Sequence, residues 1–165
     1  MNMIDPVLAE LAHEAATTRR LLERLPQDCL TWKPHEKSMT LGRLAGHIAE
    51  IPGRISGILE PDEFDFATGG MTPHTASSAA DALAVFNQGV TQATERMKQQ
   101  TTDRLLATWR LKKGGKLLLE IPRFGAIRSL LLNHLIHHRG QLSVYLRLQN
   151  VPLPSIYGPT ADEPM

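Results

Sequence analysis

Three histidines are the residues of this sequence whose spacing is best suited to chemistry. His134 and His138 are four residues apart in a long segment with helical periodicity, and at about 100° per residue they point about 40° apart. Two imidazoles at this spacing lie on one side of a helix, as chelation of a metal ion requires. We therefore expect both rings in the middle of the buried stripe that the apolar residues of the segment define, which consists of Ile127, Leu130, Leu131, Leu142 and Tyr145, together with Gln141.

His47 occupies the equivalent place on another predicted helix, between Leu44 and Ile48 of its apolar face. Two helices thus each direct histidine toward the core, and we expect His47, His134 and His138 to meet. Neutral rings in a dry core need partners for both nitrogens, and one metal ion satisfies one nitrogen of each ring. The other interpretation is three hydrogen-bonded core histidines without metal, which is the commoner role of a single inward histidine.

A metal held by three neutral histidines keeps at least one coordination position for water or substrate, as catalytic sites do. A zinc ion bound in this way lowers the pKa of its water toward ~7 and polarises a carbonyl group. It can equally bind a thiol as thiolate and present it to an electrophile. Imidazole suits several divalent metals. We expect zinc or nickel, with iron and manganese as alternatives.

Two further residues are candidates for handling protons at this site. Glu50 lies one turn beyond His47, where it could orient a ligand histidine or accept a proton, although a surface carboxylate is the simpler interpretation. Tyr145 lies two turns beyond His138, and the simpler interpretation is a core tyrosine with a satisfied hydroxyl. His137 projects to the edge of the stripe, and Arg139 points away from it and is expected at a surface or interface.

The elements that must position these residues are predicted to be four helices. The first has Asp5 as its N-cap and Pro6 at its first helical position, and the second is kinked at Pro52. Ser38 and Thr40 are possible caps of the second helix, and Ser78 caps the third. The predicted helices cover about residues 5–25, 40–58, 79–100 and 123–149.

The segments between the helices include one short β-hairpin. Its strands are predicted around Trp109–Leu111 and Lys116–Leu119, with Gly114 and Gly115 in the turn. Residues 61–74 are predicted as a loop and residues 151–165 as an extended tail. The expected fold class is therefore all-α: one domain over residues 1–165, a four-helix bundle with a small β-hairpin between the third and fourth helices.

The composition excludes several classes of partner. Lys plus Arg (18) nearly balance Asp plus Glu (17) over 165 residues, so the chain lacks the overall positive charge typical of nucleic-acid binding. The single cysteine, Cys29, excludes an internal disulfide and suits a reducing compartment. No apolar run approaches the ~20 residues that span a bilayer, and no signal peptide is recognised. We expect a cytoplasmic protein that binds neither nucleic acid nor membranes.

The ordered motifs of the chain resemble those of the DinB family. The resemblance covers nearly the whole sequence and is strongest around the histidine pair. The matching segments are Trp32–Pro34, Leu44–Ile48, Gly114–Lys116 with Pro122–Arg123, Asn133–Leu142, Tyr145–Arg147 and Val151–Pro159.

The resemblance implies a four-helix bundle with a divalent-metal site at His47, His134 and His138, and a homodimer. Relatives include S-transferases and isomerases that use low-molecular-weight thiols. The expected function is therefore a divalent-metal-dependent enzyme acting on a small molecule, either hydrolase-like or a thiol-dependent S-transferase. The alternative from another class is a non-catalytic stress-response protein that binds a metal or a small ligand.

Overall fold

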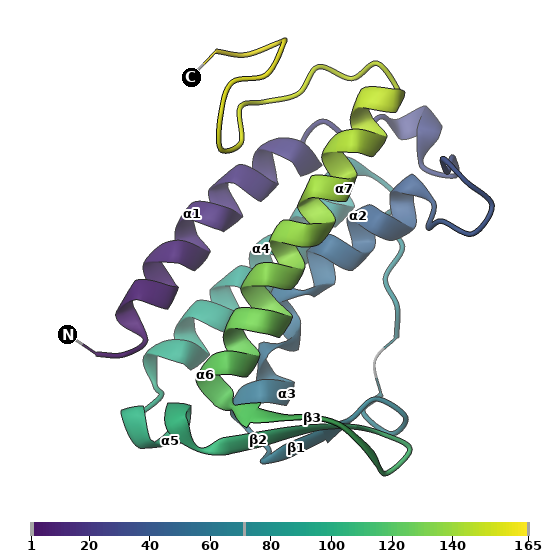
Figure 1. Cartoon of the computed structure of the whole chain (residues 1–165). Coiled ribbons are helices and arrows are strands. Elements are labelled where there is room, and N and C mark those ends of the chain that lie inside the picture. The colour runs from purple at the N-terminus through teal and green to yellow at the C-terminus, as the bar shows by residue number, and fades with distance from the viewer. Residues whose placement is uncertain (1, 71, 165) are drawn as a thin grey trace.

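Four long helices lie side by side in the computed structural model (Figure 1), which describes residues 2–70 and 72–164. Met1, Met71 and Met165, which belong to the predicted domain, loop and tail, lie outside the described residues. The chain is mostly helical, as expected, and two of the long helices each pack against the other two. The four are α1 (Asp5–Leu22) and α2 (Leu41–Glu50), which pack against α4 (Ala79–Lys98) and α7 (His134–Leu148).

Side-chain caps start two of these helices where the sequence predicts them. The Thr40 hydroxyl accepts a hydrogen bond from the backbone N–H of Arg43 (3.2 Å) at the start of α2, and Ser78 accepts one from Asp81 (3.0 Å) at the start of α4. The prediction for α1 is wrong by one residue. Ile4 is its N-cap and Asp5 is the first helical residue.

The second predicted helix is interrupted at Pro52, as expected from the missing backbone N–H of proline. After α2 the chain forms a 3₁₀ turn, η2 (Pro52–Ile55), and then the short helix α3 (Ser56–Leu59). Helix α4 crosses this interruption closely, because a Cβ atom added to Gly89 would lie 2.8 Å from the backbone nitrogen of Gly53. Gly89 therefore permits an approach that a larger residue at this position would prevent.

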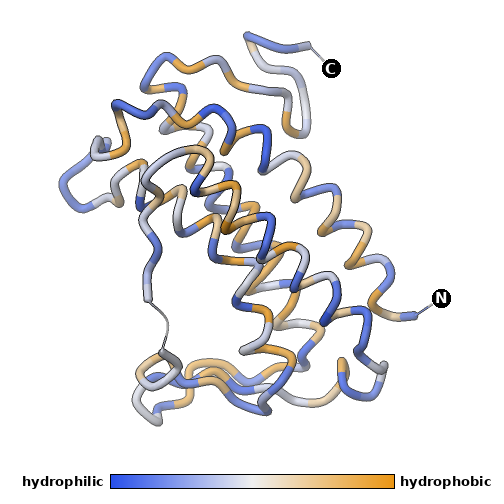
Figure 2. The backbone as a smooth tube through the Cα atoms, turned by 180° about the vertical axis from the view of Figure 1, so that it is seen from behind, coloured by the Kyte–Doolittle hydropathy of each residue, from blue (hydrophilic) through white to orange (hydrophobic). Residues whose placement is uncertain are grey.

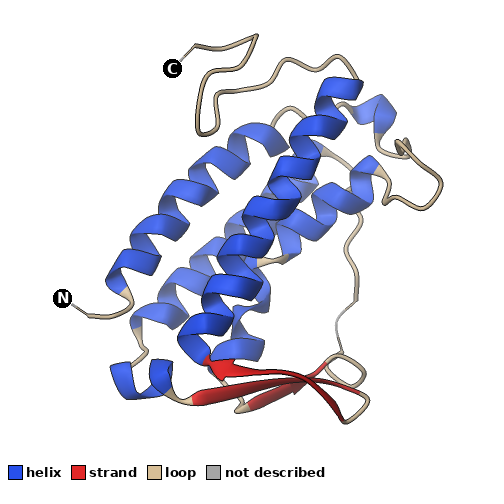
Figure 3. Ribbon diagram, viewed as in Figure 1, coloured by secondary structure: helices blue, strands red, loops and turns tan. Residues whose placement is uncertain are grey.

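A three-stranded sheet covers one end of the helices (Figure 3). Strand β2 (Thr108–Lys113) pairs antiparallel with β3 (Lys116–Pro122) and parallel with β1 (Glu63–Asp65). Only β2 and β3 were expected; residues 61–74 were predicted as a loop, and β1 is too short to show an alternating pattern. Its last residue, Asp65, accepts hydrogen bonds from the N–H groups of the turn residues Gly114 (2.8 Å) and Gly115 (2.7 Å), whose φ angles of 58° and 78° suit glycine.

The last predicted helix is not uniform along its length. The segment starts with the single turn α6 (Arg123–Ala126). Residues Ile127–Asn133 then form a π-helix, which is wider than an α-helix because its hydrogen bonds join residues five apart. Helix α7 follows. Arg123 is fully buried and anchors the start of this segment through hydrogen bonds to the backbone oxygens of Ile58 (3.1 Å) and Pro61 (2.8 Å). A second short helix, α5 (Thr102–Leu106), precedes β2.

The π-helix changes which residues of α7 face the core. The core stripe contains Leu135, Leu142 and Leu146, with Arg139 among them, whereas His134 and His138 lie half-buried beside it. The predicted central position of the histidines and the predicted surface position of Arg139 are therefore wrong. Each residue of a π-helix turns the chain by less than 100°, so a single helical projection cannot be carried across Ile127–Asn133.

The tail after α7 runs back over α1, at the end of the molecule opposite the sheet (Figure 1). Arg24, two residues after α1, and Arg20 of α1 donate hydrogen bonds to the backbone oxygens of Pro152 (3.0 Å) and Ser155 (3.1 Å), respectively. Hydrophobic and hydrophilic residues alternate along the long helices (Figure 2), and the apolar faces form one core. Among the described residues, no helix is both long and apolar enough to cross a membrane.

Candidate metal centre

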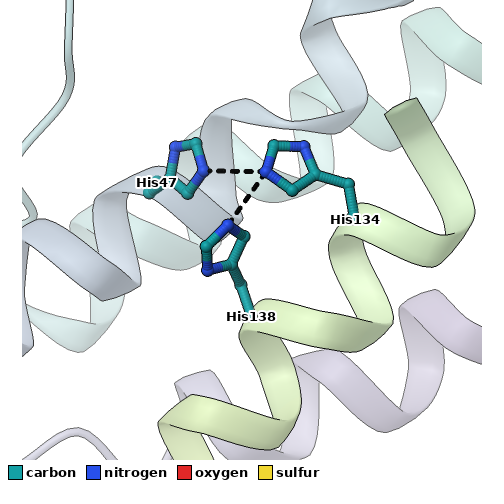
Figure 4. Close-up of side chains that lie close together, drawn as sticks. All are labelled: His47, His134 and His138. Carbon is teal, nitrogen blue, oxygen red and sulfur yellow. Dashed lines mark hydrogen bonds between the residues drawn. The ribbon is translucent and has the colours of Figure 1, made fainter. Parts of the chain in front are cut away.

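The three predicted ligands meet in the structure (Figure 4). The Nε2 atom of His134 lies 3.2 Å from that of His47 and 2.9 Å from that of His138. One candidate ligand atom from each ring lies within 4.8 Å of the other two. Two nitrogens bound tetrahedrally to one zinc ion at ~2.0–2.1 Å are separated by roughly 3.3 Å. The spacing of the rings is therefore close to that of a three-histidine metal site.

The second nitrogen of two of the rings is held by an acceptor outside the cluster. The Nδ1 atom of His47 lies 3.0 Å from a carboxylate oxygen of Glu50, and that of His138 lies 2.8 Å from the amide oxygen of Gln141. An acceptor at Nδ1 keeps the proton there and leaves Nε2 as a lone pair. Two such lone pairs thus point at the Nε2 atom of His134, an arrangement that suits metal-binding histidines.

The surroundings keep His134 and His138 neutral near pH 7. Burial, together with the nearby rings of His138 and His47, lowers the pKa of His134 from 6.5 to about 4. Burial also lowers the pKa of His138. Because only a neutral imidazole can bind a metal ion, these shifts favour metal binding over protonation.

Glu50 lies behind His47 and is bonded from several sides. Its Oε1 atom faces Nδ1 of His47, Arg43 (3.1 Å) and Arg54, and its Oε2 atom accepts from the backbone N–H of His74 (2.8 Å). Burial alone would raise the pKa of this carboxyl group. Hydrogen bonds from His47 and from the backbone of His74, with the positive charges of the arginines, lower the pKa to about 2 instead. Glu50 is therefore a carboxylate placed to orient His47.

Tyr145 and His137 lie near the cluster but have other partners. The Tyr145 hydroxyl donates to the backbone oxygen of Met39 (3.2 Å), and its ring meets Trp32 edge-on. No hydrogen bond in the described part of the chain joins Tyr145 to the three histidines. His137 is exposed, with its Nε2 atom 3.2 Å from the amide nitrogen of Gln141.

A pocket of about 250 Å³ opens beside His134. Its walls come from η2 and α3, from the segment around β1, from β2 and from the π-helix. The second and fourth predicted helices, the segment 61–74 and β2 thus all contribute to the pocket. Sequence reasoning missed two of its residues, Arg54 and Trp109. Arg54 could have been recognised from its spacing, because it lies one turn after Glu50 and two turns after His47.

Comparison with known proteins agrees with the fold. The model of the DinB family matches residues 1–164, and the chain belongs to that family. An uncharacterised protein of Bacillus subtilis, YrdA, is 29% identical over 160 residues, which are 97% of this chain and 91% of that protein.

Two solved structures share the fold. A DinB-like protein of Bacillus cereus superposes with a TM-score of 0.72 over 93% of this chain and 97% of its own, at 24% identity. The DinB-like protein YjoA of Bacillus subtilis superposes with a TM-score of 0.70 over 92% of this chain and 98% of its own, at 19% identity. At these identities the likeness concerns the fold alone.

Proposed function

We propose that this protein is a divalent-metal-dependent enzyme built on a four-helix bundle, with His47, His134 and His138 as the metal ligands. The observation that carries the proposal is the convergence of three Nε2 atoms, with Nδ1 of His47 and Nδ1 of His138 hydrogen-bonded elsewhere. Without a cation or protons, three lone pairs within 4.8 Å of one another repel. A bound metal ion resolves this conflict.

The protein's own residues have defined tasks in this proposal. Glu50 holds the proton on Nδ1 of His47, and Gln141 does the same for His138. When bound, zinc or nickel, or alternatively iron or manganese, would supply a Lewis acid that activates water or a thiol. The pocket beside His134 would hold the substrate next to the ion. Tyr145, whose hydroxyl is bonded to Met39, is retained only as a candidate for proton transfer after a rearrangement of that contact.

Two reaction classes fit this site: hydrolysis of an ester or amide, and transfer of a low-molecular-weight thiol to an electrophile. One screen separates them. Tag-free protein is stripped with a chelator, reloaded with each metal, and assayed on ester, amide and electrophile panels with and without thiol. Metal-dependent turnover that requires thiol assigns an S-transferase, and metal-dependent turnover without thiol assigns a hydrolase. Metal binding without turnover in either arm supports a non-catalytic binding protein instead.

We also propose that the protein is a homodimer, as the DinB resemblance implies. Val144 and Leu148 of α7 are 57% and 54% exposed, and at four-residue spacing they lie on one helix face. An isologous contact between two copies would cover this face. Light scattering at tens of micromolar tests the proposal, and a monomeric mass contradicts it.

A further inference from the structure

The pocket beside His134 differs in chemistry from the metal centre that it adjoins. Eight of its lining residues are apolar, and three more are glycines. Arg54 is the charged side chain among them, and no carboxylate lines the pocket in the described ranges. The apolar wall residues are Ile51, Ile58, Phe64, Phe66, Trp109, Leu111, Leu130 and Leu131.

The aromatic wall of the pocket is held in place by specific contacts. Trp109 is buried, and its indole N–H donates to the backbone oxygen of Gly57 (3.0 Å). Phe64 fits against Gly57 and Gly69, where added Cβ atoms would lie 3.0 Å and 2.3 Å from its ring, and Phe66 meets it edge-on. These contacts preorganise an apolar wall, which lowers the cost of binding an apolar group.

The charge at the mouth of the pocket is positive. Glu50 carries one negative charge and is bonded to both Arg43 and Arg54, so the three side chains together leave one positive charge. Arg54 bonds to Glu50 through Nη2, and its planar guanidinium has further donors that suit a planar carboxylate. A metal ion on three neutral histidines would add charge of the same sign.

We propose that the pocket binds a small organic carboxylate with a compact apolar body. The carboxylate faces the edge formed by Arg54 and His134, and the body lies against Trp109. A dry cavity of about 150 Å³ accepts one benzene ring, so 250 Å³ suits one ring with a substituent or a short branched chain. The identity of the substrate's reactive end rests on the proposed function, whereas binding at Arg54 does not require the metal.

Quenching of tryptophan fluorescence tests this proposal directly. The chain has two tryptophans, and the substitution Trp32→Phe leaves Trp109 as the single reporter in the pocket. The probe is 4-bromobenzoate, whose bromine quenches tryptophan on contact. Two matched probes separate its parts: 4-bromobenzyl alcohol has the ring without the charge, and acetate has the charge without the ring. We expect saturable quenching by 4-bromobenzoate, with an affinity about tenfold above that for the alcohol. Acetate at the same concentration should not prevent this quenching.

Variants of the wall identify where the probe binds. Ser56→Phe and Leu130→Phe each place a ring in the pocket and should abolish quenching, whereas Thr91→Phe on the exposed face of α4 should not change it. Arg54→Gln should reduce the affinity for 4-bromobenzoate to that for the alcohol, and Arg54→Lys should retain part of the preference. Circular dichroism establishes that each variant is folded. Two pocket-filling variants are used so that the test still works if one of them does not fold.

The outcomes separate this inference from the proposed function. Quenching that does not saturate, equal affinity for the acid and the alcohol, or no effect of both filling variants overturns the inference. Each titration is run on the zinc-free and the zinc-loaded protein. If zinc fails to bind but 4-bromobenzoate still quenches in an Arg54-dependent manner, the proposed function fails and the pocket assignment stands. If zinc binds and the probe does not, the pocket assignment alone fails.

Discussion

Two clusters of polar side chains lie on different sides of α7. They differ in whether the buried polar groups have partners of opposite charge. On one side, Arg139 and Glu14 are 1% and 4% exposed and form an ion pair of 2.5 Å. Tyr157 of the tail completes it, because its hydroxyl donates to Glu14 (2.8 Å) and its ring lies 4.9 Å from the guanidinium. On the other side, His134 and His138 direct lone pairs at a third ring without an opposite charge between them.

The comparison shows how a structural cluster differs from a ligand site. In the first, an acid and a base neutralise each other and join α1, α7 and the tail. In the second, His47, His134 and His138 are like groups, and none of them supplies an opposite charge for the Nε2 atoms of the others. Their supporting partners, such as Glu50 beside His47, bind the nitrogens that face away from the cluster. A set of donors that is complete except at one common point calls for a ligand at that point.

The largest expected effect concerns the ligand site itself. His134→Ala removes the ring to which both other Nε2 atoms are closest, and we expect at least a thousandfold loss of zinc affinity, about 4 kcal/mol. Isothermal titration on tag-free protein measures it. His137→Ala is the matched control, since that ring is exposed and outside the cluster. Equal losses in the two variants would show that the cluster does not bind the metal.

The next effect breaks the structural cluster. Glu14→Gln leaves Arg139 charged and buried without its counterion, and we expect the free energy of unfolding to fall by about 3 kcal/mol. Zinc affinity should not change. The double variant Glu14→Leu with Arg139→Met removes both charges and should recover most of the loss. Urea denaturation of the three proteins measures these differences, and a stable Glu14→Gln protein would refute the assignment.

A smaller effect is expected from the side chain that supports one of the proposed metal ligands. Glu50→Gln weakens the acceptor that holds Nδ1 of His47, and we expect zinc affinity to fall about 10- to 100-fold. Glu120→Gln is the control, because Glu120 is an exposed sheet residue paired with Arg110. An affinity unchanged by Glu50→Gln would mean that His47 keeps its orientation without this carboxylate.

The smallest effect concerns pH and the metal-free protein. The folded-state pKa of His134 is lowered from 6.5 to about 4, so below 6.5 the unfolded chain binds a proton that the folded chain does not. Stability therefore falls as the pH is lowered from about 6.5 to about 4, by on the order of 1–2 kcal/mol after allowance for partial exposure. Thermal melts of wild type and His134→Ala should converge in this range. Parallel curves would contradict the shift.

Much of the site was predictable because its signals are local. The four-residue spacing of His134 and His138, and the place of His47 on an apolar helix face, depend only on helical periodicity. The caps at Thr40 and Ser78 likewise depend on residues a few positions away. The prediction that the three histidines meet required one further step, namely that two amphipathic helices turn the faces bearing histidine to each other.

The rest could not be predicted because it depends on distant partners. The three residues of β1 become a strand only by pairing with β2. Arg139 is buried because Glu14, 125 residues earlier, supplies the opposite charge. Trp109 reaches the pocket because the sheet folds against α3, a contact that no local pattern records. A helical wheel also failed at Ile127–Asn133, since it assumes a constant turn per residue.

The π-helix has a consequence for how this protein tolerates insertions and deletions. Its first end is held by Arg123, which is bonded to α3 and the residues after it, and its second end carries the imidazoles. Loss of one residue within Ile127–Asn133 would allow the segment to tighten to an α-helix, whose larger turn per residue offsets most of the lost rotation. We therefore expect such a deletion to keep His134 and His138 directed toward His47. Loss of one residue between His134 and His138, in the regular α-helix, would instead turn the two rings about 100° apart.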